Sequence, residues 1–96
     1  MKNILFPADY KQALLDRFKN MTIRVGEEMG KYRVGETYRA ESYDGEDWDV
    51  NVLIKDVQMV DLDQLVNLGV SDVEIEKVKS EGGQDQVEVI RFEIMG

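Results

Sequence analysis

The sequence predicts a single α+β domain, built as a small β-barrel that carries short helices. Several segments alternate apolar and polar residues with the period of two that is typical of strands, and only three segments show helix signals. Two of the strand segments change phase partway along, which indicates the bulges and bends that close small barrels. At 96 residues, the chain has room for one hydrophobic core.

Local sequence signals divide the chain into seven elements. The expected order is a helix at 7–18, strands at 21–25, 37–42 and 48–59, helices that begin after Asp61 and after Ser71, and a last strand at 87–94. Pro7 suits the first turn of the first helix, and Asp44-Gly45 supplies a hairpin turn. The long strand changes phase near Lys55-Asp56, where we expect a bulge.

The two helices before the last strand share one pattern at their starts. Asp61 is followed three residues later by Gln64, and Ser71 is followed three residues later by Glu74. Each pair has the spacing of a capping box, in which the two side chains satisfy free backbone N–H groups at the start of a helix. We therefore expect two short helices, which end at Gly69 and at the glycine pair 82–83.

The composition excludes several kinds of chemistry. The chain has no cysteine and no histidine, so thiolate nucleophiles, imidazole bases and the common zinc sites are absent, and no metal or other cofactor is expected. No apolar run is long enough for a membrane-spanning helix or a signal peptide, which leads us to expect a cytoplasmic protein.

Charge is distributed unevenly along the sequence. The net charge is −8, yet residues 1–40 carry eight Lys/Arg against five acidic residues, and residues 41–96 carry four against fifteen. An acidic chain repels phosphate backbones, so binding to extended duplex DNA is not expected. A local basic site in the first half remains compatible with a nucleoside-like small molecule or a short RNA.

The strongest candidate site is the sequence from Lys19 to Arg24. If Met21 and its alternating neighbours face the core, Thr22 and Arg24 share the other face of the strand, and Lys19 lies where the helix meets that strand. A lysine with a lowered pKa can act as a base, and a threonine hydroxyl next to a base can act as a nucleophile. The alternative is structural, because a lysine is favourable at a helix C-terminus and threonine is a good strand former.

Three further candidates each have a structural alternative. Tyr43 and Trp48 flank the hairpin tip and are both able to stack on a base, although a domain of this size favours Trp48 in the core. Glu74 is a candidate acid, but its capping position already explains it. The acidic segment 44–49 lacks the spacing of a calcium loop and is expected to be a solvated hairpin tip.

Four motifs follow one another along nearly the whole chain: Lys19-x-x-Thr22-Ile23-Arg24 after a helix, Gly35-Glu36 at the start of a strand, Val60-Asp61-Leu62-Asp63 at the end of a long strand, and Gly69-Val70-Ser71 before a short helix. In this order they resemble the ASCH domain family, whose members are PUA-like small barrels related to RNA-binding modules. The similarity is greatest to short bacterial members that act as amidohydrolases on N4-acetylcytidine.

The resemblance implies roles for individual residues. In those enzymes a lysine, a threonine and a glutamate carry the chemistry; the first two match Lys19 and Thr22, and the arginine of the motif matches Arg24. The family has glycine where this chain has Arg17, which would place that side chain beside the site. Leu68 stands where the family has its catalytic glutamate.

The resemblance and the residues together leave three functions open. The first is a pocket that binds a nucleoside or an RNA-derived ligand through Arg17, Lys19, Thr22, Arg24 and Trp48. The second is hydrolysis of an N-acylated nucleoside, in which Thr22 attacks, Lys19 is the base and Glu74 replaces the lost glutamate. The third is an adaptor whose acidic face (residues 44–63) docks a basic protein partner.

Overall fold

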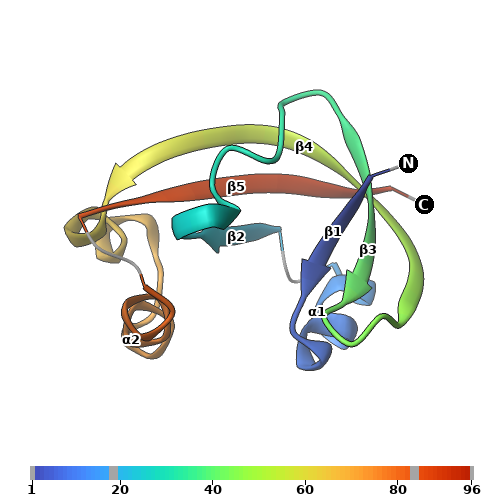
Figure 1. Ribbon diagram of the computed structural model, residues 1–96, viewed down its shortest axis with the longest axis horizontal. Helices are drawn as coiled ribbons and strands as arrows, with labels where there is room; N and C mark the ends of the chain where they lie inside the picture. The colour runs from blue at the N-terminus through green and yellow to red at the C-terminus, as the bar shows by residue number, and fades with distance from the viewer. Residues whose placement is uncertain (1, 18–19, 83–84, 96) are drawn as a thin grey trace.

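A five-stranded mixed sheet with strand order β1-β3-β4-β5-β2 forms the framework of the protein (Figure 1). The computed structural model describes residues 2–17, 20–82 and 85–95. The strands are β1 (Asn3–Phe6), β2 (Met21–Arg24), β3 (Thr37–Ser42), β4 (Asp47–Asp61) and β5 (Gln86–Met95). The helices are α1 (Lys11–Leu15) and α2 (Asp72–Ser80), and the 3-10 turns are η1 (Ala8–Tyr10), η2 (Gly26–Glu28), η3 (Leu62–Gln64) and η4 (Val66–Leu68).

The long antiparallel pair β4 and β5 runs through the whole molecule and bends along its length (Figure 1). The register between them shifts between Ile54 and Asp56, so the predicted bulge is confirmed. A bulge changes which side chains face each surface of the sheet. Before the bulge, Ile54 faces one hydrophobic cluster, and after it Val60 faces another.

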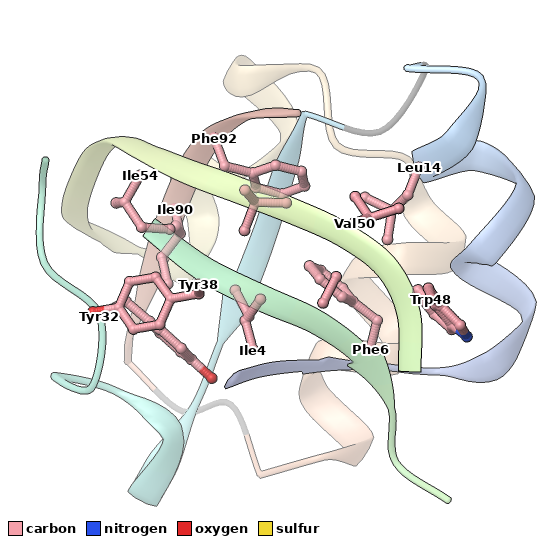
Figure 2. Packing of buried hydrophobic residues seen from close by; sticks show 12 residues of the cluster. Ile4, Phe6, Leu14, Tyr32, Tyr38, Trp48, Val50, Ile54, Ile90 and Phe92 are labelled. Atoms are coloured by element: carbon pink, nitrogen blue, oxygen red, sulfur yellow. The ribbon is translucent and has the colours of Figure 1, made fainter. Parts of the chain in front are cut away.

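The larger cluster fills the inside of the curved sheet (Figure 2). It combines residues of β1, β3, β4 and β5 with Leu14 of α1, and Phe6 lies at a junction of rings with Trp48 and Phe92. The smaller cluster lies on the other surface, where Val78 of α2 and Leu65 pack against Val87 of β5 and its neighbours. Thus α2 covers one end of the sheet, and α1 lies at the other.

Strand β2 is the edge strand on which the predicted site lies. Its residues alternate as expected: Met21 and Ile23 are partly buried against the smaller cluster, and Thr22 and Arg24 point to the other surface. That other surface is the more deeply buried one, since Thr22 and Arg24 are only 6% and 4% exposed. Strand β2 is therefore covered on both surfaces. The Met21 side packs against the smaller cluster and α2, and the Thr22 side is covered by a second layer of side chains.

The predicted α+β class is confirmed, with differences in two elements near the N-terminus. Residues 3–6 form a strand that was not expected, and the first helix is shorter than 7–18 because regular helical structure ends at Leu15. The strand at 37–42 lies where expected, and so do both capped segments. The segment that begins after Asp61 consists of two 3-10 turns, whereas the segment that begins after Ser71 is an α-helix.

The strand pairings leave the sheet open, because β1 and β2 are its two edges. The closed barrel therefore stays a prediction. Within the described ranges, the helices are too short or too polar to span a membrane.

Candidate functional site

A pocket of about 340 Å³ opens beside the edge strand β2. One wall is β2 itself, another is the corner that follows β1, and a third is α2. The lining residues are Pro7, Tyr10, Thr22, Ile23, Arg24, Val25, Glu28, Tyr43, Glu74, Lys77, Val78 and Glu81. The pocket thus lies between the two edge strands of the sheet, β1 and β2, which a closed barrel would join.

The Arg24 side chain spans this gap between the two sheet edges. Its Nη2 donates to the backbone carbonyl of Leu5 in β1 at 2.8 Å, and its Nη1 donates to the hydroxyl of Tyr43 at 3.3 Å. The guanidinium lies over the rings of Phe6 and Tyr32, at 5.2 and 5.4 Å from their centroids. These contacts fix a cation in a nearly buried position at the bottom of the pocket.

Strand register explains why the Leu5 carbonyl is free to accept this hydrogen bond. In the parallel pair of β1 and β3, the N–H of Tyr43 donates to the carbonyl of Phe6, so the backbone groups of Phe6 face β3. Hydrogen-bonding direction alternates along a strand, and those of Leu5 therefore face outward. By the same rule, the Phe92 to Asn20 hydrogen bond directs the backbone groups of Ile23 toward the open edge of β2.

Arg24 has spare hydrogen-bonding capacity. Its Nε is buried and has no partner among the described residues, and no ion pair in the described chain involves this side chain. Glu88 lies opposite Arg24 on β5 and is also buried; its Oε2 accepts from the Gly30 N–H at 3.0 Å, and its Oε1, like Arg24 Nε, is covered and has no partner among the described residues. Because buried polar groups normally have hydrogen-bond partners, the unpartnered Nε marks Arg24 as a donor with one hydrogen bond still to make.

Charged side chains surround the rest of the pocket. Glu28, Glu74 and Glu81 contribute three carboxylates, against the two cations Arg24 and Lys77. The Lys77 ammonium lies 5.1 Å from the centre of the Tyr10 ring, over which it is held by a cation–π contact. The pocket therefore combines a cation at its base with a rim that is acidic on balance.

Tyr32 belongs to the larger hydrophobic cluster and contacts the Arg24 guanidinium without lining the pocket. Burial raises the pKa of its phenol above the usual 10.0, and the nearby Arg24 charge acts in the opposite direction. The Tyr32 hydroxyl is thus protonated at neutral pH, and the ring serves as a neutral support for the guanidinium.

The structure brings together some of the predicted site residues. Thr22, Arg24 and Glu74 line the same pocket, with Glu74 in the first turn of α2, where its N–H donates to Ser71 Oγ at 3.3 Å. Lys19 lies outside the described residues. Arg17 is exposed and does not line the pocket, and its φ of 63° is the left-handed conformation that glycine prefers.

Two other predicted positions lie in hydrophobic clusters. Trp48 is 5% exposed and stacks on Phe6 at 6.3 Å between ring centroids, so the core alternative is confirmed for it and it does not line the pocket. Leu68 packs, partly buried, against the smaller cluster. The adjacent Gly69 has a φ of 85°, which agrees with its predicted role as a helix stop.

Sequence reasoning missed several pocket residues. Tyr43 was considered only together with Trp48, and Lys77 and Glu81 were not singled out. A spacing of three and seven residues from Glu74 places Lys77 and Glu81 on one helix face, which was a readable signal. No local pattern pointed to Glu28.

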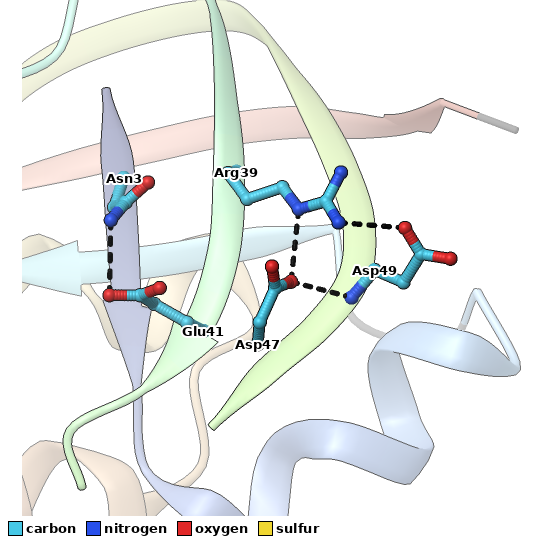
Figure 3. Close-up of polar contacts among 5 residues, drawn as sticks. All are labelled: Asn3, Arg39, Glu41, Asp47 and Asp49. Carbon is cyan, nitrogen blue, oxygen red and sulfur yellow. Dashed lines mark hydrogen bonds and ion pairs between the residues drawn. The ribbon is translucent and has the colours of Figure 1, made fainter. Parts of the chain in front are cut away.

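The acidic hairpin forms its own contacts on the outer surface of the sheet (Figure 3). Arg39 Nε donates to Asp47 at 2.9 Å and Arg39 Nη2 donates to Asp49 at 2.7 Å. Asp49 also donates its N–H to Asp47, and the Arg39 hydrogen bond is the main reason why the pKa of Asp47 is lowered. In the part of the chain that the structure describes, no three acidic side chains are grouped closely enough to hold a metal ion.

Comparisons with known proteins add no relative to this description. No protein-family model matches the sequence, no curated protein is significantly similar to it, and no solved structure matches its fold.

Proposed function

We propose that this protein is an ASCH-like domain of PUA-like barrel type whose pocket at the open edge of β2 binds a nucleoside. The observation that carries the proposal is the buried Arg24 at the base of the pocket, with a free Nε and no carboxylate in ion-pair contact among the described residues. A nucleobase offers carbonyl and ring-nitrogen acceptors to such a donor.

The surrounding groups fit a flat polar ligand. Thr22 lines the same pocket, and the outward N–H and C=O of Ile23 supply one donor and one acceptor at the strand edge. A base edge with adjacent donors and acceptors is able to pair with such backbone groups.

The charges of the rim favour an uncharged nucleoside over a nucleotide or RNA. Three carboxylates line the pocket against two cations, and one of those cations, Arg24, is already buried at the base. A phosphate would approach Glu28, Glu74 or Glu81 and be repelled. We therefore expect cytidine to bind more tightly than cytidine monophosphate.

An NMR titration of the full chain tests this function. Cytidine and N4-acetylcytidine should shift the amide signals of residues 22–25, and cytidine monophosphate should bind several-fold more weakly. Glu81→Gln should reduce the difference in affinity between cytidine and cytidine monophosphate, because it removes a negative charge that lines the pocket. Glu76→Gln, which removes one negative charge from α2 outside the pocket, should leave that difference unchanged. Shifts that avoid residues 22–25 would contradict the proposal.

A second candidate function is hydrolysis of an N-acylated nucleoside. The observation that favours it is that Thr22 and Glu74 line one pocket. The resemblance to the ASCH family puts Leu68 where those enzymes have their glutamate, so Glu74 would have to supply the carboxylate. Thr22 Oγ would attack the acyl carbonyl and lose its proton to the base, the role that the resemblance gives to Lys19, while the amine of the nucleoside would leave with a proton from Glu74, so that the acyl group remains on Thr22 as an ester. Water would then attack this ester and give a proton to the Glu74 carboxylate, the carboxylic acid product would leave, and Thr22 Oγ would regain its proton from the base.

Incubation with N4-acetylcytidine decides between binding and hydrolysis. Release of cytidine and acetate that is lost in Thr22→Ala and reduced roughly 10²–10⁴-fold in Glu74→Gln would support hydrolysis. Cytidine release at the uncatalysed rate would reject it for this substrate. Release that survives both Thr22→Ala and Lys19→Ala would reject the mechanism.

A further inference from the structure

Among the residues that line the pocket, Tyr43 is the one that combines a large exposed ring with a hydrogen bond to Arg24. Its side chain is 58% exposed although it is a large aromatic ring, it borders the pocket, and its hydroxyl accepts a hydrogen bond from Arg24 Nη1. It lies directly after β3, on the far side of the gap from β2. A ring in this position has one edge on the buried cation and a face in solvent.

The backbone beneath Tyr43 is held firmly. Its N–H donates to the Phe6 carbonyl at 3.2 Å, and the turn that follows is closed by the Gly45 N–H on the Ser42 carbonyl at 3.0 Å. The buried Ser42 hydroxyl also accepts from the Glu46 N–H at 3.0 Å. Because the main chain is fixed on both sides, little backbone entropy remains to be lost when the ring contacts a ligand.

The other aromatic candidates have their faces engaged. Trp48, which the sequence also placed near the hairpin tip, packs on Phe6 in the core. Tyr10 lines the pocket, but its ring carries the Lys77 ammonium and lies 6.2 Å from Phe6 between centroids. Of the aromatic rings that line the described pocket, Tyr43 is the one that is mostly exposed.

We propose that Tyr43 is the specificity-determining residue of the pocket, with its ring stacked on the nucleobase and its hydroxyl holding Arg24 so that Nε donates to an acceptor of that base. This inference rests on the proposed function of the pocket. Of the two aromatic residues that the sequence offered for stacking, Tyr43 and Trp48, it assigns the role to Tyr43. Stacking accepts any base, so the choice among bases comes from the Arg24 donor that Tyr43 positions.

The two parts of the role predict different effects. Tyr43→Ala removes the ring and should weaken cytidine binding roughly 5- to 150-fold, the range that alanine substitution of stacked aromatics gives. Tyr43→Phe keeps the ring and removes only the acceptor for Nη1, so binding should weaken roughly 2- to 10-fold. In Tyr43→Phe, the NMR signal of the Arg24 Nε–H group should also shift before any ligand is added.

The experiment is a cytidine titration of the wild type, Tyr43→Phe, Tyr43→Ala and Val73→Ala. Val73 is 79% exposed on α2 and does not line the pocket, so its truncation controls for the loss of an exposed apolar side chain. Nuclear Overhauser contacts between the cytidine H5 and H6 protons and the Tyr43 ring should appear in the wild type and persist in Tyr43→Phe.

Three results would overturn parts of this picture in distinguishable ways. If Tyr43→Ala binds cytidine within twofold of the wild type, or if the base contacts another ring, the role of Tyr43 is wrong and the pocket proposal stands. If the Arg24 Nε–H signal is unchanged in Tyr43→Phe, the positioning role is wrong. If the wild type does not bind cytidine at all, the proposed function and this inference fail together.

Discussion

The backbone of Arg17 adopts a conformation that suits glycine better than arginine. Its φ is 63°, and its N–H donates to the Leu14 carbonyl at 3.0 Å, so it ends the α1 segment in the left-handed region. A side chain in this region costs about 1–2 kcal/mol. Arg17→Gly should therefore raise the free energy of unfolding by about 1 kcal/mol, as measured by urea denaturation.

The preceding residue supplies a matched control. Asp16 has a φ of −82°, an ordinary helical value, and its carboxylate accepts a hydrogen bond from Gln12. Asp16→Gly should lower the free energy of unfolding, since glycine adds freedom to the unfolded chain without relieving strain. Because Arg17 does not line the pocket, Arg17→Gly should leave cytidine binding unchanged. Stability that falls in both variants would contradict the explanation from φ.

At the level of elements, Ser71 connects the capping of α2 to the pocket. The Ser71 hydroxyl accepts the N–H of Glu74, and one turn further along the helix presents Lys77 to the same cavity. Loss of an N-cap typically costs about 1 kcal/mol. Ser71→Ala should lower stability by about that amount in thermal unfolding and should weaken cytidine binding, because the first turn of α2 forms one wall.

Ser80 provides the comparison at the other end of α2. Its hydroxyl donates to the Lys77 carbonyl at 2.7 Å, but it caps no free N–H group and does not line the pocket. Ser80→Ala should have a smaller effect on stability and none on binding. Equal effects of the two substitutions would show that the N-cap has no special role.

The β3–β4 hairpin gives a pH dependence with a definite sign. The hydrogen bond from Arg39, aided by the Asp49 N–H, lowers the pKa of Asp47 below the usual 3.8. The folded state therefore holds this proton less tightly than the unfolded state. The resulting stabilisation is present above about pH 4 and is lost as the pH falls through the folded pKa.

This pH dependence is measurable by comparing the wild type with Asp47→Asn. The wild type should be the more stable at pH 7, and the difference should disappear as the pH is lowered from 5 to 2. Since the Asp47 side chain is 53% exposed and the Arg39 side chain is 32% exposed, solvent screens this ion pair, so the difference should be small and should decrease in 1 M salt. A difference that grows on acidification would contradict the assigned direction.

Local patterns identified the elements that are stabilised by near neighbours. The strand at 37–42, the bulge near Lys55 and the Ser71 cap each depend on residues within a few positions, and each was predicted. In contrast, β1 has only four residues, too few to show a period, and its partner β3 lies more than thirty residues away. A short strand that exists only through distant parallel pairing leaves no local signal.

At the scale of the whole molecule, the pocket depends on how distant segments meet. The period of two placed Thr22 and Arg24 on one face, which the structure confirms, but it did not show that this face is buried. Tyr43 and Lys77 join the same cavity from segments about 20 and 55 positions further along the chain. Only the curvature of the sheet, which brings β1 toward β2 across the Arg24 side chain, assembles them.

The open edge of the sheet makes a prediction about hydrogen exchange. The register directs the N–H groups of Thr22 and Arg24 toward β5, whereas that of Ile23 faces the gap and has no partner within the described segments. The Ile23 amide should exchange with solvent much faster than its two neighbours, as measured by NMR in deuterated water. If cytidine pairs with this edge, saturating cytidine should slow hydrogen exchange at the Ile23 amide selectively. Equal protection of all three amides without cytidine would contradict the open edge, because it would show that β2 is paired on both sides and that the barrel is closed.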